Sequence, residues 1–577
     1  MSGARKTTQQ AARKPNTTWR WRFMLAFWVA CGGLLVVRAV DLQVVDQDFL
    51  AHQGDIRNLR VEPLAAHRGV IRDRQGRPLA VSTPVTTLWA NPQEALEQPQ
   101  QWARLGDNPI ISARDFAARI EHHKGKEFIY LARGLAPAQA ASVLDKDVTG
   151  IHPLTEYRRY YPAGEVTSQV VGFTNIDGQG QEGIELSFNK QLAGHPGSKK
   201  VVRDLLGRVI QNIEVIKQAR PGKDLTLSLD LRLQYLAYKQ LLAATRRFDA
   251  KSASLVLLDV KTGEILAMVN QPSYNPNNRS DLDTSSLRNR AVTDVFEPGS
   301  TMKPFTVAAA LEQGLVTPTT LVNTHPGYLR VGSNVIHDHR DYGVIDVTTI
   351  LTKSSNVGIS KLALSMEPAV LPGYLSHFGF GHLTGIDFPG ESSGVLPMRA
   401  HWADVERAAL AYGYGVSVTT LQLAQAYAII ANNGVHVPVS LLKVDHPPAG
   451  TEVIRPQTAH SLINMLETVV TRRGTASRAE IPGYTVAGKT GTVHKATAHG
   501  YAENHYIGVF AGIAPASNPR LACVVMIDDP SDGQYYGGLV AAPVFSKVVG
   551  SALRILHVPP DQTDGLIAAN LSGGNQG

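Results

Sequence analysis

The chain has 577 residues, 43% of them hydrophobic, so it is too long for one compact core and should divide into two or more domains. Its formal net charge is +7, but six positive residues lie within residues 1–22, which contain no acid, leaving +7 − 6 = +1 for the rest. This distribution excludes a broadly basic, nucleic-acid-binding surface and indicates a membrane topology signal. The six residues are Arg5, Lys6, Arg13, Lys14, Arg20 and Arg22.

An apolar stretch follows this basic segment directly. Residues 23–40 contain one charge, Arg38, and as a helix they would span roughly 27 Å, enough to cross a bilayer. No small-x-small cleavage site follows, so we predict an uncleaved anchor instead of a signal peptide. The basic residues would remain in the cytoplasm, which places the rest of the chain in the periplasm as a single-pass protein of the inner (cytoplasmic) membrane.

The remaining chain predicts an α+β protein. Residues 41–225 contain short strand signals and turns without a catalytic pattern, which indicates a mostly β domain. Residues 226–560 contain a helix that begins after Thr419, with Gln422 at capping-box spacing, and end in three strands and a helix. This order predicts an antiparallel sheet covered by helices. Residues 561–577 have few large apolar side chains and predict a disordered tail.

Three short motifs in residues 226–560 carry the chemistry. They are Ser300-Thr-Met-Lys303, Ser354-Ser-Asn356 and Lys489-Thr-Gly-Thr492. A serine nucleophile needs a base, a proton relay and donors for the oxyanion, and together these residues can supply them. Residues three apart lie on one helix face, so we expect Lys303 to reach the Ser300 hydroxyl. The preceding turn places Ser300 where a helix begins, and the helix dipole there favours developing negative charge.

The same spacing also occurs elsewhere by chance. Ser187-Phe-Asn-Lys190 and Ser440-Leu-Leu-Lys443 match S-x-x-K, but neither has a turn followed by a helix, so we reject both. His337-Asp-His-Arg-Asp341 brings together potential metal ligands. Because no third histidine follows at a recognisable spacing, we predict a surface loop, no metal site and no cofactor.

The motifs and their flanks are similar to those of class B penicillin-binding proteins, specifically the septal, division-type peptidoglycan D,D-transpeptidases of the penicillin-binding protein 3 family. The resemblance covers nearly the whole chain. The matching stretches are Arg68 to Gly76, Arg158 to Gly164, Gly183 to Glu185, Val295 to Phe305, Lys353 to Lys361, Ala411 to Ala424 and Gly488 to Thr492.

This resemblance implies a non-catalytic pedestal at 41–225 and a β-lactamase-like transpeptidase domain at 226–560. It implies a peptide substrate ending in D-Ala-D-Ala, an amine acceptor, covalent inhibition by β-lactams, and docking to membrane-embedded division proteins including a glycan polymerase. The catalytic residues that it implies are Ser300, Lys303, Ser354, Asn356 and Lys489. Those implied for substrate binding are Thr490, Gly491, Thr492, Ser355, Tyr414 and Gly415.

Two other functions compete with cross-linking. Water could resolve the acyl-enzyme, as in a D,D-carboxypeptidase or β-lactam hydrolase, although no E-x-x-L-N sequence follows Ser354. A non-catalytic division scaffold or β-lactam sensor is disfavoured by the intact motif residues. One departure from the family pattern stands at His494, where relatives commonly have arginine. We expect carboxylate recognition there to be weaker or pH-dependent, as in a specialised second copy of the enzyme used in acidic conditions.

Overall fold

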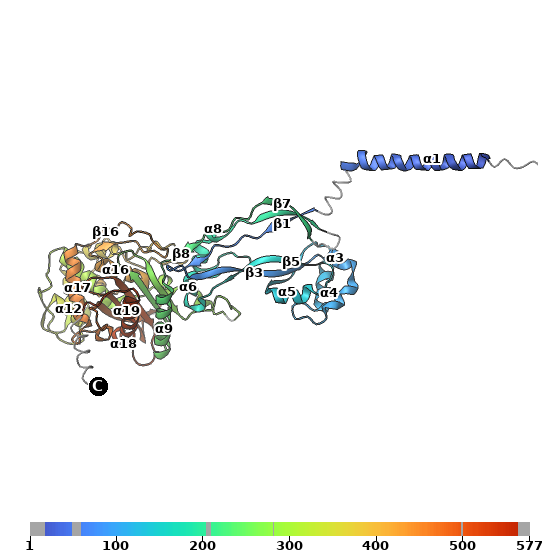
Figure 1. Ribbon diagram of the computed structural model, residues 1–577. Coiled ribbons are helices and arrows are strands. Elements are labelled where there is room, and N and C mark those ends of the chain that lie inside the picture. The colour runs from blue at the N-terminus through green and yellow to red at the C-terminus, as the bar shows by residue number, and fades with distance from the viewer. Residues whose placement is uncertain (1–17, 49–58, 204–208, 281, 498–499, 563–577) are drawn as a thin grey trace, which may run out of the picture. The chain divides into compact units, whose positions relative to one another are not determined.

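The computed structural model describes the chain except for residues 1–17, 49–58, 204–208, 281, 498–499 and 563–577 (Figure 1). The chain forms two compact units that interleave along the sequence. The N-terminal unit comprises Met1–Ala65, Thr86–Thr155 and Pro196–Ala219, and the C-terminal unit comprises Ala66–Val85, Glu156–His195 and Arg220–Gly577. We predicted two domains that meet at residue 225 and are each continuous in sequence. Each of these units is instead built from three separate segments of the chain.

The first described element is one long apolar helix. Helix α1 (Thr18–Val40) continues into the π-helical turn η1 (Asp41–Val45), and nearly all of its side chains are exposed. Thr18–Val45 has a mean hydropathy of 2.1 over its most apolar window, and it is long enough to cross a membrane. This confirms the predicted N-terminal apolar helix. Arg20 and Arg22 lie in its first turns, while the other four basic residues lie outside the described residues.

The N-terminal unit combines a small antiparallel sheet with a helical subdomain. The sheet has the order β1-β6-β7. The subdomain packs around buried apolar side chains that include Leu88, Phe116 and Ile120. The elements of this unit are β1 (Leu59–Leu64), α3 (Pro92–Glu97), η2 (Pro99–Leu105), α4 (Ala113–His122), β4 (Ile129–Leu135), α5 (Pro137–Leu144), β6 (Gly197–Arg203) and β7 (Val209–Lys217), with β3 (Pro78–Ala90) and β5 (Ile151–Tyr160) running through both units.

The upstream part of the C-terminal unit brings three of the matching stretches together. Arg68 Nε and Arg159 Nε each donate to the Glu185 carboxylate at 2.6 Å, and all three side chains are buried. Arg68 also donates to Asn189 Oδ1 at 2.8 Å. The elements here are β2 (Ile71–Arg72), η3 (Gly164–Val166), α6 (Ser168–Val171), α7 (Gly183–Ser187), α8 (Asn189–Leu192) and β8 (Leu225–Thr226).

The centre of the C-terminal unit is a five-stranded antiparallel sheet in the order β10-β9-β19-β18-β17. The strands are β9 (Ser252–Asp259), β10 (Ile265–Gln271), β17 (Ala487–Thr497), β18 (Gly500–Ala514) and β19 (Leu521–Asp528). Strands β9 and β10 are buried throughout, because helices cover the sheet. This confirms the predicted antiparallel sheet with helical cover.

Several helices pack directly against this sheet (Figure 1). Helix α16 begins as predicted, with the Thr419 hydroxyl accepting from Gln422 N at 3.1 Å and Gln422 Oε1 accepting from Thr419 N at 2.9 Å. The covering elements are α9 (Leu231–Arg247), α10 (Arg290–Thr293), α16 (Thr420–Ala431), α17 (Pro456–Val470), α18 (Gly537–Val540) and α19 (Ala542–Ile555), and η6 (Ser477–Ala479) packs against the last three of these helices.

The remaining elements form a second, mainly helical region of the same unit, in which most helices share the main apolar core while β12 and β13 pack in a small separate cluster. They are η4 (Thr284–Leu287), η5 (Gly299–Met302), α11 (Lys303–Glu312), β11 (Leu321–Asn323), β12 (Tyr328–Val331), β13 (Asn334–His337), β14 (Val344–Asp346), α12 (Val347–Lys353), α13 (Asn356–Leu364), α14 (Val370–His377), α15 (Asp404–Ala411), β15 (Val435–His436) and β16 (Thr451–Glu452). At the end of the described chain, Asp561 accepts hydrogen bonds from Thr485 and Ser517. Residues 563–577 of the predicted tail lie outside the described residues.

Candidate active site

The first motif spans the junction between a 3₁₀ turn and an α-helix. Ser300 belongs to the 3₁₀ turn η5, and Lys303 begins α11. Gly299 precedes the serine with φ +54, and a Cβ there would lie 2.3 Å from a methyl carbon of Val493. Only glycine therefore allows this turn to lie so close to β17. The expected position of Ser300 at a helix start is found, and its hydroxyl is partly exposed while Lys303 is fully buried.

The second motif spans the junction of two helices. Ser354 is the C-cap of α12 and has left-handed backbone angles, φ 59 and ψ 43, which are uncommon for a residue other than glycine. Asn356 is the first residue of α13. The left-handed turn separates the two helices within two residues, so Ser354 and Asn356 both reach the amine of Lys303.

The hydroxyl of Ser354 is the centre of the hydrogen-bond network. Its Oγ lies 3.0 Å from Nζ of Lys303 and 3.0 Å from Nζ of Lys489. The same Oγ lies 3.1 Å from Ser300 Oγ. Lys303 Nζ further donates to the Ser354 carbonyl at 2.6 Å and to Asn356 Oδ1 at 2.8 Å. The three motifs therefore meet at one atom, and the hydrogen bonds connect Lys303 to Ser300 through Ser354 instead of directly.

Burial and charge change the titration of both amines. Burial, and to a smaller degree the neighbouring Lys489, lower the pKa of Lys303 well below its ordinary value, although the Asp338 carboxylate opposes this. Burial alone lowers the pKa of Lys489 to about 7. Two adjacent ammonium groups repel each other, so near neutral pH one amine can be neutral while the other stays charged. A neutral buried amine can accept a proton from a serine hydroxyl.

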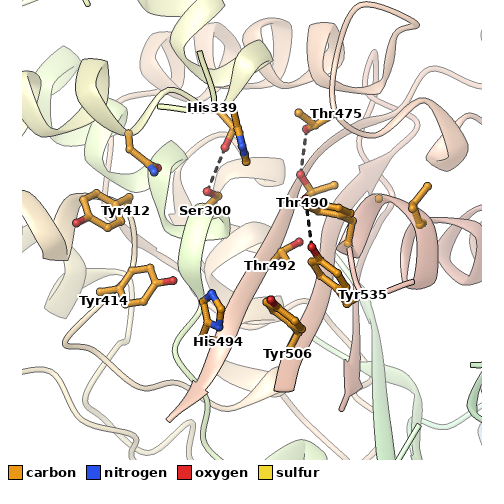
Figure 2. Close-up of a pocket in the computed structure, with 15 residues that line it drawn as sticks. Ser300, His339, Tyr412, Tyr414, Thr475, Thr490, Thr492, His494, Tyr506 and Tyr535 are labelled. Atoms are coloured by element: carbon orange, nitrogen blue, oxygen red, sulfur yellow. Dashed lines mark hydrogen bonds between the residues drawn. The ribbon is translucent and has the colours of Figure 1, made fainter. Parts of the chain in front are cut away.

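Ser300, Ser354 and Asn356 border a cavity of about 640 Å³, whereas the fully buried Lys303 and Lys489 do not line it. Ser300 lies between Tyr412 and Tyr414 on one side and strand β17, which carries Thr490 and Thr492, on the other (Figure 2). The cavity is lined by Ser300, His339, Ser354, Asn356, Tyr412, Tyr414, Thr475, Thr490, Thr492, His494, Tyr506, Tyr535, Tyr536, Gly538 and Leu539. Burial, with a smaller contribution from Glu297, raises the pKa of Tyr414 to about 12, so this side chain is neutral at physiological pH.

Hydroxyl groups gather along the β17 wall. Thr475 Oγ1 and Thr490 Oγ1 lie 3.0 Å apart. Thr492 Oγ1 accepts from the backbone N–H of Gly537 at 3.0 Å, which leaves the hydroxyl proton free to donate. Hydroxyl donors beside the buried, cationic Lys489 form a suitable site for a carboxylate.

Three residues predicted to bind substrate do not line this cavity. Ser355 is buried, caps α13 by accepting from Gly358 N at 2.9 Å, and donates to Asp338 at 2.6 Å. Gly491 lies against the backbone of Pro298, and Gly415 N donates to Glu297 Oε1 at 2.9 Å. Their contacts are with the protein, so they position the walls of the site.

Two residues of the predicted surface loop take part in the site. The segment is largely exposed as expected, but Asp338 accepts from the backbone N–H groups of Asn356 and Val357 and from Ser355. A carboxylate at this helix N-terminus is favoured by the helix dipole, and it fixes the start of α13. His339 lines the cavity. Asp338 and Asp341, which flank His339, are a signal in the sequence, but that signal indicates only a metal cluster or a surface loop and not a helix cap.

No group of three or more histidine, cysteine, aspartate or glutamate side chains among the described residues is placed to hold a metal ion. The catalytic candidates are hydroxyls, amines and one amide. The chemistry that they support is therefore serine acylation assisted by an amine base.

Comparisons with known proteins extend over both units. A family model for the penicillin binding protein transpeptidase domain matches residues 253–550, and one for the penicillin-binding protein dimerisation domain matches residues 63–227. The probable peptidoglycan D,D-transpeptidase PbpC of Pseudomonas aeruginosa is 43% identical, over 94% of this chain and 96% of its own length. The peptidoglycan D,D-transpeptidase FtsI of Escherichia coli K12 is 44% identical, over 97% and 96%.

Solved structures agree with these matches. Penicillin-binding protein 3 of Mycobacterium tuberculosis, complexed with aztreonam, has a TM-score of 0.68 and 30% identity, covering 87% of this chain and 98% of that one. The transpeptidase domain of Burkholderia pseudomallei penicillin-binding protein 3 has a TM-score of 0.54 and 42% identity, covering 58% of this chain and 97% of that one.

Proposed function

This chain belongs to the penicillin-binding protein transpeptidase family, and we propose that it is a septal peptidoglycan D,D-transpeptidase whose nucleophile is Ser300. Ser300 Oγ attacks the carbonyl carbon between the two terminal D-alanines of a stem peptide. Its proton passes through the Ser354 hydroxyl to Lys303, and the same hydroxyl returns a proton to the departing amine. The C–N bond breaks, D-alanine leaves, and an ester joins the stem to Ser300.

An amine of a neighbouring stem then attacks this ester. It loses a proton to the same relay, forms the cross-link and restores the Ser300 hydroxyl. Backbone N–H groups of Ser300 and Thr492 donate to the oxyanion of each tetrahedral intermediate. Lys489 supplies positive potential, and the hydroxyls of Thr490 and Thr492 bind the terminal carboxylate of the stem. A β-lactam places its ring amide at the same point, and ring opening leaves Ser300 acylated.

The observation that carries this proposal is the position of Ser354 Oγ, within hydrogen-bond distance of Ser300 Oγ and of both lysine amines. A hydroxyl both donates and accepts, and its proton rotates freely. It can therefore donate to Ser300 while Lys303 is charged, and accept from Ser300 once Lys303 is neutral. Asn356 holds the Lys303 amine in place for this exchange.

The membrane topology belongs to the same proposal. Arg20 and Arg22 stand at the N-terminal end of the apolar helix, which favours a cytoplasmic N-terminus and a periplasmic catalytic domain. Residues 41–225 then form a non-catalytic pedestal that docks membrane-embedded division proteins, including a glycan polymerase. Residues 226–560 form the catalytic domain that consumes the glycan's stem peptides.

Labelling with fluorescent penicillin tests the nucleophile. We expect Ser300→Ala to abolish covalent labelling, because the other hydroxyl of this network, that of Ser354, is already engaged by Lys303 and Lys489. Ser187→Ala is the matched control, since Ser187 begins an S-x-x-K sequence, is exposed and donates its hydroxyl proton to the Asp387 carbonyl at 2.7 Å. Label that persists on Ser300→Ala would identify another nucleophile.

A product assay separates cross-linking from hydrolysis. The full chain is supplied with a D-Ala-D-Ala stem peptide and an amine-bearing acceptor stem, and the products are resolved by mass. We expect cross-linked dimer that increases with acceptor concentration and disappears in Ser300→Ala. Release of D-alanine with only the shortened monomer would instead support a carboxypeptidase, and labelling without any turnover would support a sensor.

A further inference from the structure

A second cavity, of about 680 Å³, lies beside the proposed active site in the C-terminal unit. We call it the rear cavity. It is bordered by α9, η6, α18 and α19, elements that pack against one another. Its apolar lining includes the buried side chains of Phe248, Val540 and Val544. Neither the serine motifs nor the proposed mechanism uses this cavity.

The border of the rear cavity carries an excess of positive charge. Arg247 on α9, Arg478 on η6 and Lys547 on α19 all line it, against one carboxylate, Glu480. Within the described part of the chain none of the three cations forms an ion pair. The Arg247 guanidinium lies 5.3 Å from the Phe248 ring centre, which brings charge close to the apolar lining. A ligand that matches this border carries a negative group beside an apolar body.

The short helix α18 separates the rear cavity from the active-site cavity. Leu539 lines both cavities, Gly538 lines only the active site and Val540 only the rear cavity. At the start of α18, Gly537 N donates to Thr492 Oγ1 at 3.0 Å. A Cβ on Gly537 would lie 2.4 Å from the Gly491 carbonyl oxygen. The start of α18 is therefore in direct contact with the strand that carries Lys489 and Thr492.

We propose that the rear cavity binds a small organic carboxylate with an apolar body, and that its occupancy changes the rate at which Ser300 is acylated through α18. The apolar part fills the space against Val540 and Val544. The carboxylate is held by the guanidinium groups of Arg247 and Arg478, whose planar donors match its geometry. Glu480 disfavours a ligand of higher negative charge, because it would lie near the same anion.

Binding is tested with 4-phenylbutyrate on the full chain in lipid nanodiscs, by saturation-transfer NMR with empty nanodiscs as the blank. The protein is first acylated with penicillin, so that the active-site cavity is occupied. We expect saturable binding that weakens about tenfold, a loss of about 1.4 kcal/mol, in Arg247→Glu/Arg478→Glu. Arg246→Glu, on the same helix but outside the lining, should bind as wild type does. The uncharged 4-phenylbutanamide and inorganic phosphate should both bind about tenfold more weakly than 4-phenylbutyrate.

Coupling is tested on the unacylated chain. Saturating 4-phenylbutyrate should change the second-order rate constant for fluorescent penicillin by about threefold or more, within the usual range of coupling between sites. The effect should vanish in Arg247→Glu/Arg478→Glu, which removes the rear site but not the carboxylate site of β17. An effect that persists in this variant would mean competition at the active site and would overturn the coupling.

The remaining outcomes are equally decisive. Absence of saturable binding, equal binding of the amide or of phosphate, or insensitivity to the charge reversals would each overturn the proposed site. Binding without any change in the acylation rate would overturn its link to α18. The binding arm can be repeated on Ser300→Ala without penicillin, so its result does not depend on the proposed transpeptidase function.

Discussion

Two buried clusters of charged side chains in the C-terminal unit are built in opposite ways. In the first, the guanidinium groups of Arg68 and Arg159 both donate to the Glu185 carboxylate at 2.6 Å. In the second, the amines of Lys303 and Lys489 converge on the Ser354 hydroxyl, a neutral group. Both clusters are removed from water, but only the arginine cluster has a carboxylate that directly compensates its charge.

The difference is consistent with a structural role for the arginine cluster and with the chemical role that we propose for the lysine cluster. A buried charge that lacks an opposite charge loses stability or changes its protonation state. The lysine cluster changes its protonation state, since burial lowers the pKa of both amines. A lowered pKa makes an amine a competent base near neutral pH. The arginine cluster has no such freedom, because guanidinium groups stay charged in proteins.

Among the substitutions that distinguish the two clusters, Lys303→Met should have the largest effect, a loss of acylation rate. Removing a general base lowers rates by about 10²- to 10⁴-fold, so acylation by fluorescent penicillin should slow by about this factor. Unfolding free energy should change little, because the desolvation cost of the buried amine disappears together with its hydrogen bonds. Stopped-flow labelling and denaturant unfolding measure the two quantities. A variant that unfolds easily but acylates normally would make Lys303 a structural residue.

In the arginine cluster, Glu185→Ala should have the opposite effect, because it should lower the unfolding free energy and leave the acylation rate unchanged. The change leaves two buried guanidinium groups without a counter-charge, which costs about 3–5 kcal/mol of unfolding free energy. The acylation rate of the protein that remains folded should match wild type. Glu182→Ala, on the same segment but only partly buried, serves as the control and should change stability far less. A normal melting curve for Glu185→Ala would show that the cluster is not structural.

These two clusters also mark how far the sequence could predict the molecule. The residues of each motif are close in sequence, so local spacing identified Ser300, Lys303, Asn356 and Lys489, and the cap at Thr419 located a helix. Contacts between distant residues left no such signal. Arg68 and Glu185 are 117 residues apart.

The same limit applies within the site. Asp338 caps α13 from 18 residues upstream of Asn356. Ser354 links the two lysines because the end of α12 forces it into a left-handed conformation, which spacing does not encode. Conversely, Ser355 and Gly491 belong to the motifs but contact the protein, because Ser355 caps α13 and Gly491 lies against the backbone of Pro298.

The unequal titration of the two lysines predicts a bell-shaped pH dependence of acylation. As pH falls, Lys303 gains a proton and stops acting as a base, so the rate declines on the acidic side. As pH rises through about 7, Lys489 loses the charge that attracts the substrate carboxylate, so the rate also declines on the alkaline side. Lys489→Arg keeps its charge and should remove only the alkaline decline. An alkaline decline that is unchanged in this variant would assign it to another group.

The smallest effect should come from His494→Arg at the exposed end of the β17 wall. His494 lies 4.6 Å, ring centre to ring centre, from Tyr506 and lines the cavity that we assign to the substrate. A guanidinium is always charged and presents five donors, so arginine at this position should hold the substrate carboxylate more tightly than the imidazole does. Acylation of His494→Arg by fluorescent penicillin should therefore be faster than acylation of the wild type. Because exposed charges contribute about 1 kcal/mol or less, we expect an increase of about fivefold or less. A rate equal to that of the wild type would exclude position 494 from carboxylate recognition.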